Sequence, residues 1–250
     1  MKNKFIDYYS HRSAIYARYR PKYPPELFSY LASISPQRNT AWDCATGSGQ
    51  AATGLTAYFK NTFASDPSKG QIANADRCEN LHYFISSAER VGMRSHSVDL
   101  VTVAQAIHWF DFDLFYGEIE RILKKNGILA FWSYNLLTID HDIDKIINKF
   151  YWETLKGYWP VERRFIDEDY MTVPLPFAEM ISPVFNMAAE WDIDQFTGYL
   201  SSWSAVHIFR EKHGRDPFDL ICNDLKNVWG NRGDSKIIKW PLNLRIGINS

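Results

Sequence analysis

The first half of the chain alternates short apolar segments with helix-like segments, and this alternation restricts the fold more than any other feature. Five apolar segments of four to seven residues are expected strands: Thr40 to Cys44, Thr62 to Ser65, Leu81 to Ile85, Val98 to Ala104 and Ile128 to Ser133. Helical patterns fill the intervals between them. Because strands that alternate with helices run in the same direction, the pattern predicts a doubly wound, mostly parallel α/β sheet.

The segment between the last two expected strands contains helix start and stop signals. Phe115 and Ile119 recur at helical spacing, and either Asp111 or Asp113 can cap the start of the helix. The dipeptide Asn126-Gly127 is expected to stop the helix, because both residues tolerate the left-handed conformation that a helix terminus often needs. The chain would then turn directly into the next strand.

After residue 134 the pattern is less regular, and we expect helical additions over one core sheet. The expected helices are Asp140 to Tyr158, Gln195 to Lys212 and Phe218 to Trp229, and the expected strands are Phe185 to Trp191 and Ile237 to Ile246. Prolines divide the stretch from Pro174 to Pro183, which predicts a loop. Pro241 predicts that the last strand is an edge or bulged strand, because proline cannot donate to a ladder.

Charge and apolar patterning exclude several classes of protein. Lys and Arg number 28 against 29 Asp and Glu, so the chain has no bulk field for polyanions and we expect no nucleic-acid partner. Apolar runs such as Ile128 to Trp132 are too short to span a membrane. Asp7, His11 and Arg12 interrupt the N-terminus, so it lacks a signal peptide's apolar block, and we expect a cytoplasmic protein. The three cysteines lie far apart, and no metal site is expected.

The stretch from Ala41 to Ala52 follows an expected strand and opens a helix. Gly47 and Gly49 permit a tight turn and close approach of a ligand, and the helix start offers free N–H groups. Asp66 ends the next expected strand, 23 residues after Asp43. A carboxylate at that place can accept hydrogen bonds from a ribose diol. The turn therefore predicts a site for a nucleoside-containing cofactor.

Two cofactors compete for this turn. Gly47, Gly49 and Ala52 match G-x-G-x-x-[G/A], so a nicotinamide-dependent (NAD) oxidoreductase is one alternative. Asp43 favours a cofactor with an amino group and a sulfonium, because a fixed anion four residues before Gly47 would repel a pyrophosphate. A cofactor-binding scaffold that has lost its reaction is a third alternative.

The first half of the chain resembles the class I S-adenosylmethionine-dependent methyltransferases, whose first motif is [D/E]-x-G-x-G-x-G. Asp43, Gly47 and Gly49 match this motif, and Ala45 replaces its first glycine. Four further stretches resemble family motifs: Ala64 to Ser68, Ser86 to Glu89, Val98 to Ala106 and Leu123 to Leu129. The resemblance implies a seven-stranded Rossmann-like sheet with a helical cap, and in-line methyl transfer to a small-molecule acceptor.

A narrower resemblance concerns the trans-aconitate methyltransferase-like proteins of the methyltransferase type 11 group, which methylate small carboxylic acids. It rests on Tyr16 to Pro24, Ala104 to Asp111 and Trp203-Ser204. It implies a carboxylic acid as one class of acceptor. The implied organisation is a single domain of residues 1–250, with a lid at 1–37, a cofactor-binding half at 38–134 and a substrate-pocket half at 135–250.

The resemblance to the methyltransferases also assigns residues to the cofactor S-adenosylmethionine. The methionine part would lie against the backbone of the turn and Asp43, the ribose against Asp66, the adenine against the second and third strands, and the methyl group near the fourth strand. The complete set of implied cofactor residues is Asp43, Ala45, Thr46, Gly47, Gly49, Asp66, Pro67, Ala88, Glu89, Ala104 and Gln105.

Three further residues are candidates for the acceptor side. His108 is the candidate general base if the acceptor must lose a proton, because imidazole titrates near pH 7, and a structural histidine is the alternative. Arg20 would pair with a carboxylate of the cofactor or substrate. Trp109 would contact substrate or stabilise a sulfonium, or serve only in packing. Arg163 and Arg164 could add positive charge to the acceptor pocket, but we expect them to form a surface pair outside the site.

Overall fold

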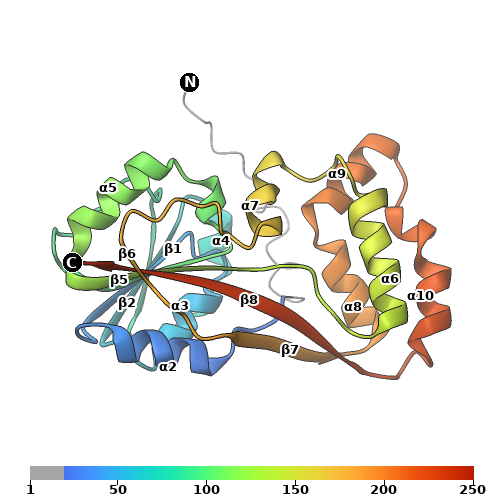
Figure 1. The fold of residues 1–250 in the computed structure, drawn as a ribbon, viewed down its shortest axis with the longest axis horizontal. Helices are drawn as coiled ribbons and strands as arrows, with labels where there is room; N and C mark the ends of the chain where they lie inside the picture. The colour runs from blue at the N-terminus through green and yellow to red at the C-terminus, as the bar shows by residue number, and fades with distance from the viewer. Residues whose placement is uncertain (1–19) are drawn as a thin grey trace.

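A computed structural model describes residues 20–250, and its centre is an eight-stranded mixed sheet of strand order β3-β2-β1-β4-β5-β8-β6, with β7 paired to β8 (Figure 1). The five parallel strands are β1 (Thr40–Cys44), β2 (Asn61–Asp66), β3 (Leu81–Ile85), β4 (Val98–Ala104) and β5 (Leu123–Tyr134). The antiparallel strands are β6 (Ala178–Met180), β7 (Phe185–Trp191) and β8 (Lys236–Asn249). The prediction of a mostly parallel, doubly wound sheet is confirmed. The lid residues Tyr16 to Tyr19 lie outside the described part of the chain.

Helices cover both faces of the parallel strands. On one face Leu31 of α2 (Pro25–Ile34) and Leu55 of α3 (Gln50–Leu55) share a buried cluster with Leu100 of β4. On the other face Phe115 of α5 (Phe112–Ile122) packs in a cluster with Val101. Neighbouring residues of β4 therefore face opposite layers, as the pleat of a strand requires. The short helix α4 (Lys69–Ala73) follows β2.

A helical cap lies beyond one end of the sheet, where β7 ends and β8 begins (Figure 1). It contains α6 (His141–Lys149), the π-helical turn η3 (Phe150–Thr154), the 3-10 turn η4 (Val161–Arg163), α7 (Arg164–Asp167), α8 (Ile193–Ser201), α9 (Ser204–His213), the 3-10 turn η5 (Pro217–Leu220) and α10 (Cys222–Trp229). No helix among residues 20–250 is long and apolar enough to cross a membrane.

Two expected cap helices differ in the structure. The helix predicted from Asp140 to Tyr158 is α-helical only to Lys149 and continues as the π-helical turn. The helix predicted from Gln195 to Lys212 is divided into α8 and α9, because Trp203 has an extended backbone and its buried ring packs against Phe150 at a centroid distance of 6.3 Å. Within the predicted loop at 174–183, residues 178–180 form the short strand β6, which makes the sheet eight-stranded instead of seven-stranded.

The start of β5 also differs from the prediction. Helix α5 begins after Asp111, which caps it, but it ends at Ile122, and Asn126-Gly127 lies within β5. Asn126 has the predicted left-handed backbone, with φ of 60°. Here this conformation forms an irregularity in the strand, between the pairs Val98–Leu123 and Leu100–Ile128.

A buried carboxylate holds this irregular segment. Asp99 has no exposed surface, and its side chain accepts hydrogen bonds from Lys124 Nζ at 2.7 Å, from the Thr40 backbone at 2.8 Å and from the Asn39 backbone at 3.1 Å. The predicted helix, which would stop at Asn126-Gly127, would include Lys124. In the structure Lys124 lies in β5 and pairs with the Asp99 carboxylate of β4.

The expectation for Pro241 is wrong for the strand as a whole, because β8 has β5 on one side and β6 and β7 on the other. The ladder between β5 and β8 ends at the pair Tyr134–Leu242, and Pro241 itself faces Asn186 of β7. Proline is tolerated at this point because the ladder with β5 ends at the neighbouring residue.

We expect Asp99→Asn to lower the free energy of unfolding by about 2 kcal/mol, because the partly exposed Lys124 ammonium loses its counter-charge and an amide N–H₂ group replaces one acceptor oxygen of a fully buried side chain. Urea denaturation measures this change. Asp194→Asn is a suitable control, because Asp194 is 61% exposed in its ion pair with Arg232, and it should cost less than about 1 kcal/mol. Equal effects of the two substitutions would contradict the structural role of Asp99.

Candidate active site

The candidate site lies where the strand order reverses, between the carboxyl ends of β1 and β4. After β1 the backbone passes through three left-handed residues, Ala45, Gly47 and Gly49, with φ of 53°, 57° and 87°. Helix α3 then begins at Gln50. The tight turn predicted from the glycines is confirmed, and Ala45 adopts the left-handed backbone that a glycine would take more easily.

Asp43 links the turn to the sheet through side-chain hydrogen bonds. Its side chain has no exposed surface and accepts hydrogen bonds from Thr102 Oγ1 on β4 at 2.7 Å and from Thr46 Oγ1 in the turn at 2.5 Å. Burial raises the pKa of Asp43 to about 6. The structure therefore shows Asp43 organising the turn, and its contact with a ligand stays a prediction.

Asp66 lies beside the turn, at the end of β2 as the spacing predicted. Its carboxylate accepts hydrogen bonds from the backbone N–H of Gly47 at 3.0 Å and of Ser68 at 2.8 Å. The backbone of Ser86, just after β3, donates to the Asp66 carbonyl at 3.4 Å. The ends of three neighbouring strands therefore meet around this acid.

The remaining residues implied for the cofactor lie at the carboxyl ends of β2, β3 and β4. Pro67 is half-buried and Ala88 is buried. The Glu89 carboxylate accepts a hydrogen bond from the Asp111 backbone at 3.3 Å, so it also contacts the start of α5. After the half-buried Ala104, the side chain of Gln105 donates to the Tyr134 carbonyl at 3.1 Å.

The turn has open space beside Gly47, where a nucleoside cofactor would fit, and is covered by Tyr83 at Gly49. A Cβ built on Gly47 would meet no described atom within 4 Å, so the backbone is open beside the Asp66 carboxylate. A Cβ built on Gly49 would collide with the hydroxyl of Tyr83. An open left-handed backbone next to an acid at the end of the second strand is the arrangement that a ribose-containing ligand needs.

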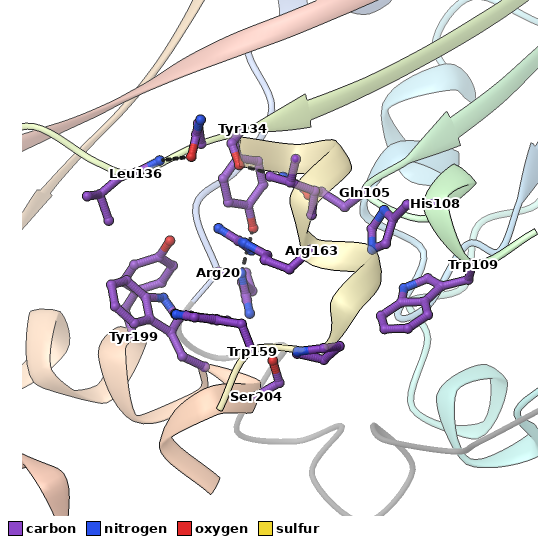
Figure 2. Close-up of a pocket in the computed structure, with 14 residues that line it drawn as sticks. Arg20, Gln105, His108, Trp109, Tyr134, Leu136, Trp159, Arg163, Tyr199 and Ser204 are labelled. Atoms are coloured by element: carbon purple, nitrogen blue, oxygen red, sulfur yellow. Dashed lines mark hydrogen bonds between the residues drawn. The ribbon is translucent and has the colours of Figure 1, made fainter. Parts of the chain in front are cut away.

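A pocket lies between the carboxyl end of the sheet and the cap (Figure 2). The core strands, the cap and the N-terminal Arg20 all contribute to its wall. The lining residues are Arg20, Gln105, His108, Trp109, Tyr134, Asn135, Leu136, Trp159, Pro160, Arg163, Ile166, Tyr199, Trp203 and Ser204. The structure therefore brings the predicted acceptor residues Arg20, His108 and Trp109 to one pocket, with Gln105 from the cofactor set.

His108 lies in the 3-10 turn η2 (Ile107–Trp109), and it is only 6% exposed. Its Nδ1 lies 2.6 Å from the buried Tyr170 hydroxyl, and its ring lies 4.8 Å from the Trp109 ring. Burial lowers the pKa of His108 to about 3, and the charge of Arg163 acts in the same direction. The imidazole is therefore neutral at pH 7 and weakly basic.

Two arginines bring positive charge to the pocket. Arg20 donates to the Tyr134 hydroxyl at 2.9 Å, and its guanidinium lies 5.4 Å from the Tyr199 ring centroid, so it joins the sheet to the cap. The expectation that Arg163 belongs to a surface pair is wrong, because Arg163 lines the pocket and lies 4.9 Å from the Trp159 ring centroid. Arg164 is exposed, as expected.

Sequence reasoning missed Arg163 because adjacent arginines ordinarily indicate solvated charge. The signal that could have identified it is the aromatic residue Trp159 four positions earlier, followed by Pro160. An aromatic face at that spacing in a turn can hold a guanidinium.

We expect Gly49→Ala to destabilise the fold by about 2 kcal/mol or more, from left-handed strain and the collision with Tyr83. Gly157→Ala is the control that measures the backbone strain without a collision, because Gly157 has φ of 82° and open space at its Cβ position. Tyr83→Phe should recover part of the excess cost of Gly49→Ala in urea denaturation. Identical costs at Gly49 and Gly157 would contradict the close packing of Tyr83.

Asp43 should make the stability depend on pH. Because burial raises its folded pKa above the usual 3.8 to about 6, the protonated form favours the fold. This stabilisation is complete below about pH 3.8 and is lost as the pH rises through about 6. Relative to wild type, Asp43→Asn should gain about 2.5 kcal/mol in free energy of unfolding between pH 4 and pH 7.5, measured by urea denaturation. The exposed control Asp219→Asn should show no such trend, and a flat difference for Asp43→Asn would contradict the raised pKa.

Comparison with known proteins identifies the family. The family model described as a methyltransferase domain matches residues 42–131. A Dictyostelium discoideum protein, provisionally named a methyltransferase, is 38% identical over 240 residues, which cover 94% of this chain and 91% of that protein. The Saccharomyces cerevisiae protein CRG1, provisionally named an S-adenosylmethionine-dependent methyltransferase, is 25% identical and covers 86% of this chain and 87% of that protein.

A solved structure agrees with these relatives. A type II methyltransferase, provisionally so named, from Anaeromyxobacter dehalogenans has a TM-score of 0.87 at 37% identity, covering 92% of this chain and 98% of that one. These similarities favour methyl transfer over the nicotinamide-dependent and non-catalytic alternatives. The chain belongs to the class I S-adenosylmethionine-dependent methyltransferases and has S-adenosylmethionine as its cofactor.

Proposed function

We propose that this methyltransferase methylates a carboxylate oxygen of a small organic acid. The observation that carries the proposal is a pocket that contains two arginines, Arg20 and Arg163, beside a histidine that burial keeps neutral. A positive pocket favours an anionic acceptor, and a weakly basic histidine favours an acceptor that has no proton to lose. The resemblance to trans-aconitate methyltransferase-like proteins supports the same class of acceptor.

The cofactor-binding half, residues 38–134, would hold the cofactor at the turn after β1. Asp66 would accept hydrogen bonds from the ribose, and the backbone from Ala45 to Gly49, including Thr46, would border the methionine part. Pro67 would pack on the adenine face, with Ala88 and Glu89 at its edge. When bound, S-adenosylmethionine supplies a methyl group made electrophilic by a positively charged sulfur.

Asp43 would act on the cofactor through charge and through the turn. Its carboxylate accepts a hydrogen bond from Thr46, so it fixes the backbone that borders the methionine part. A positively charged ligand nearby would favour the ionised carboxylate and lower its pKa below the value of about 6 that burial produces. Cofactor binding and ionisation of Asp43 would therefore support each other.

The substrate-pocket half, residues 135–250, would hold the acceptor together with Arg20. Arg163 provides a planar set of N–H donors that matches a carboxylate in a bidentate pair. The aromatic rings of Trp159, Tyr199 and Trp203 line the pocket and would exclude water around the acid. Trp109 would contact the apolar body of the substrate.

No general base is required for this reaction. A carboxylic acid has a pKa near 4 and is already ionised at neutral pH, so its oxygen is a ready nucleophile. The enzyme would align that oxygen with the methyl group of the cofactor near Ala104 and Gln105, at the end of β4. Alignment of this kind can lower a barrier by about 7 to 11 kcal/mol. His108 would then shape the pocket and need not accept a proton.

The test is an acceptor panel assayed with S-adenosylmethionine. Purified protein is incubated with small mono-, di- and tricarboxylic acids and with their amides and matched alcohols, and products are identified by mass spectrometry. We expect methyl esters of one or more acids and no product from the amides. Arg163→Met should raise the KM for the methylated acid by about tenfold or more, because a charge-assisted pair is lost.

Arg164→Met is the matched control, because it removes the adjacent, exposed arginine. It should leave the KM within about twofold of wild type. Methylation of the alcohols or amides alone would contradict the proposed acceptor, and so would an unchanged acid KM in Arg163→Met.

A further inference from the structure

We propose that Tyr151 is a positioning residue for the acceptor, and that its hydroxyl, together with Asp167, directs the guanidinium of Arg163 into the pocket. The inference rests on the proposed function, because it assigns the anion-binding role to Arg163. Neither Tyr151 nor Asp167 lines the pocket. Both would therefore act on the acceptor only through Arg163.

The hydrogen bonds form a chain that ends on the arginine. The Tyr151 hydroxyl donates to Asp167 Oδ1 at 2.6 Å and accepts from Arg163 Nε at 2.8 Å. Asp167 Oδ1 also lies 3.5 Å from Arg163 Nε. The Tyr151 hydroxyl thus forms hydrogen bonds with both the Asp167 carboxylate and the Nε of Arg163.

This arrangement leaves the outer part of the guanidinium for a ligand. Among residues 20–250, the described side-chain hydrogen bond and ion pair of Arg163 use only its Nε. Its two terminal amino groups are the pair of donors that a carboxylate can engage side by side. Figure 2 shows Arg163 and Arg20 among the residues that line the pocket.

Aromatic contacts restrain the plane of the guanidinium. Arg163 lies 4.9 Å from the Trp159 ring centroid and 5.5 Å from that of Tyr151, and these two rings lie 4.6 Å apart. Trp203 packs against Tyr151 at 5.6 Å with the rings nearly perpendicular. Because its ring is packed and its exposure is only 1%, Tyr151 has little freedom to rotate.

The local backbone explains how Tyr151 reaches this position. It belongs to the π-helical turn η3, and such turns are rare and occur frequently at functional sites. Asp167 lies four residues after Arg163, on the short helix that follows η4. Burial raises the pKa of the Tyr151 hydroxyl above its usual value, so the hydroxyl keeps its proton and can donate to Asp167.

The first test compares Tyr151→Phe with Tyr158→Phe. Tyr151→Phe keeps the packed ring and removes the hydroxyl, whereas Tyr158 is a cap tyrosine whose hydroxyl bonds to His213 at 2.6 Å, outside the pocket. For whichever acid the panel identifies, Tyr151→Phe should raise the KM by about fivefold or more with little change in kcat. Its affinity for S-adenosylhomocysteine, measured by calorimetry, should stay within about twofold, and Tyr158→Phe should leave all these values unchanged.

The second test is a double-mutant cycle. In the Arg163→Met background, Tyr151→Phe should raise the acid KM by less than about twofold, because the group that it positions is already absent. A fivefold rise in both backgrounds would overturn the proposal, since the hydroxyl would then act independently of Arg163. An unchanged KM in the single variant would overturn it as well.

A crystal structure of Tyr151→Phe with S-adenosylhomocysteine tests the positioning without an acceptor. We expect the Arg163 guanidinium to leave its place against Trp159 in this variant. An Arg163 that stays in place would overturn the positioning role. If the panel yields no methylated acid, the proposed acceptor fails, and this structure still decides separately whether Tyr151 orients Arg163.

Discussion

The site depends on one buried carboxylate between two threonines. Asp43 joins β1 to β4 through Thr102 and to the following turn through Thr46. This turn carries the backbone N–H of Gly47 to the Asp66 carboxylate, so the ends of the first two strands have a fixed geometry. Burial makes ionisation of Asp43 costly, with a pKa of about 6. The fold therefore retains a charge at a place where a positively charged ligand would compensate it.

The pocket proposed for the acceptor lies between the sheet and the cap. Tyr134 ends β5, Tyr199 belongs to α8, and Arg20 contacts both. Burial lowers the pKa of His108, and the charge of a second guanidinium, Arg163 of the cap, acts in the same direction. The same charge that would attract an anion thus reduces the basicity of the neighbouring imidazole, and both effects favour an acceptor that is already ionised.

Errors in the sequence-based description occurred where a local pattern competed with a distant contact. Asn126-Gly127 has the composition of a helix stop, but the buried Asp99 draws Lys124 into the sheet and the helix ends earlier, at Ile122. The pattern from Gln195 to Lys212 is helical throughout, but packing of the Trp203 ring in the cap divides it. Arg163 has the local sequence of a surface residue, but it contacts Tyr151, Trp159 and Asp167 and lines the pocket.

Residue patterns alone predicted the parallel strands, the left-handed turn after β1 and the place of Asp66, because periodicity, glycine spacing and strand ends are local properties of the chain. It also indicated the cofactor through the acid that precedes the turn. Three-dimensional packing alone showed which cap residues line the pocket and that His108 is neutral. These properties depend on burial and on charges that lie far apart in the chain, as Arg163 does from His108, and no spacing rule records them.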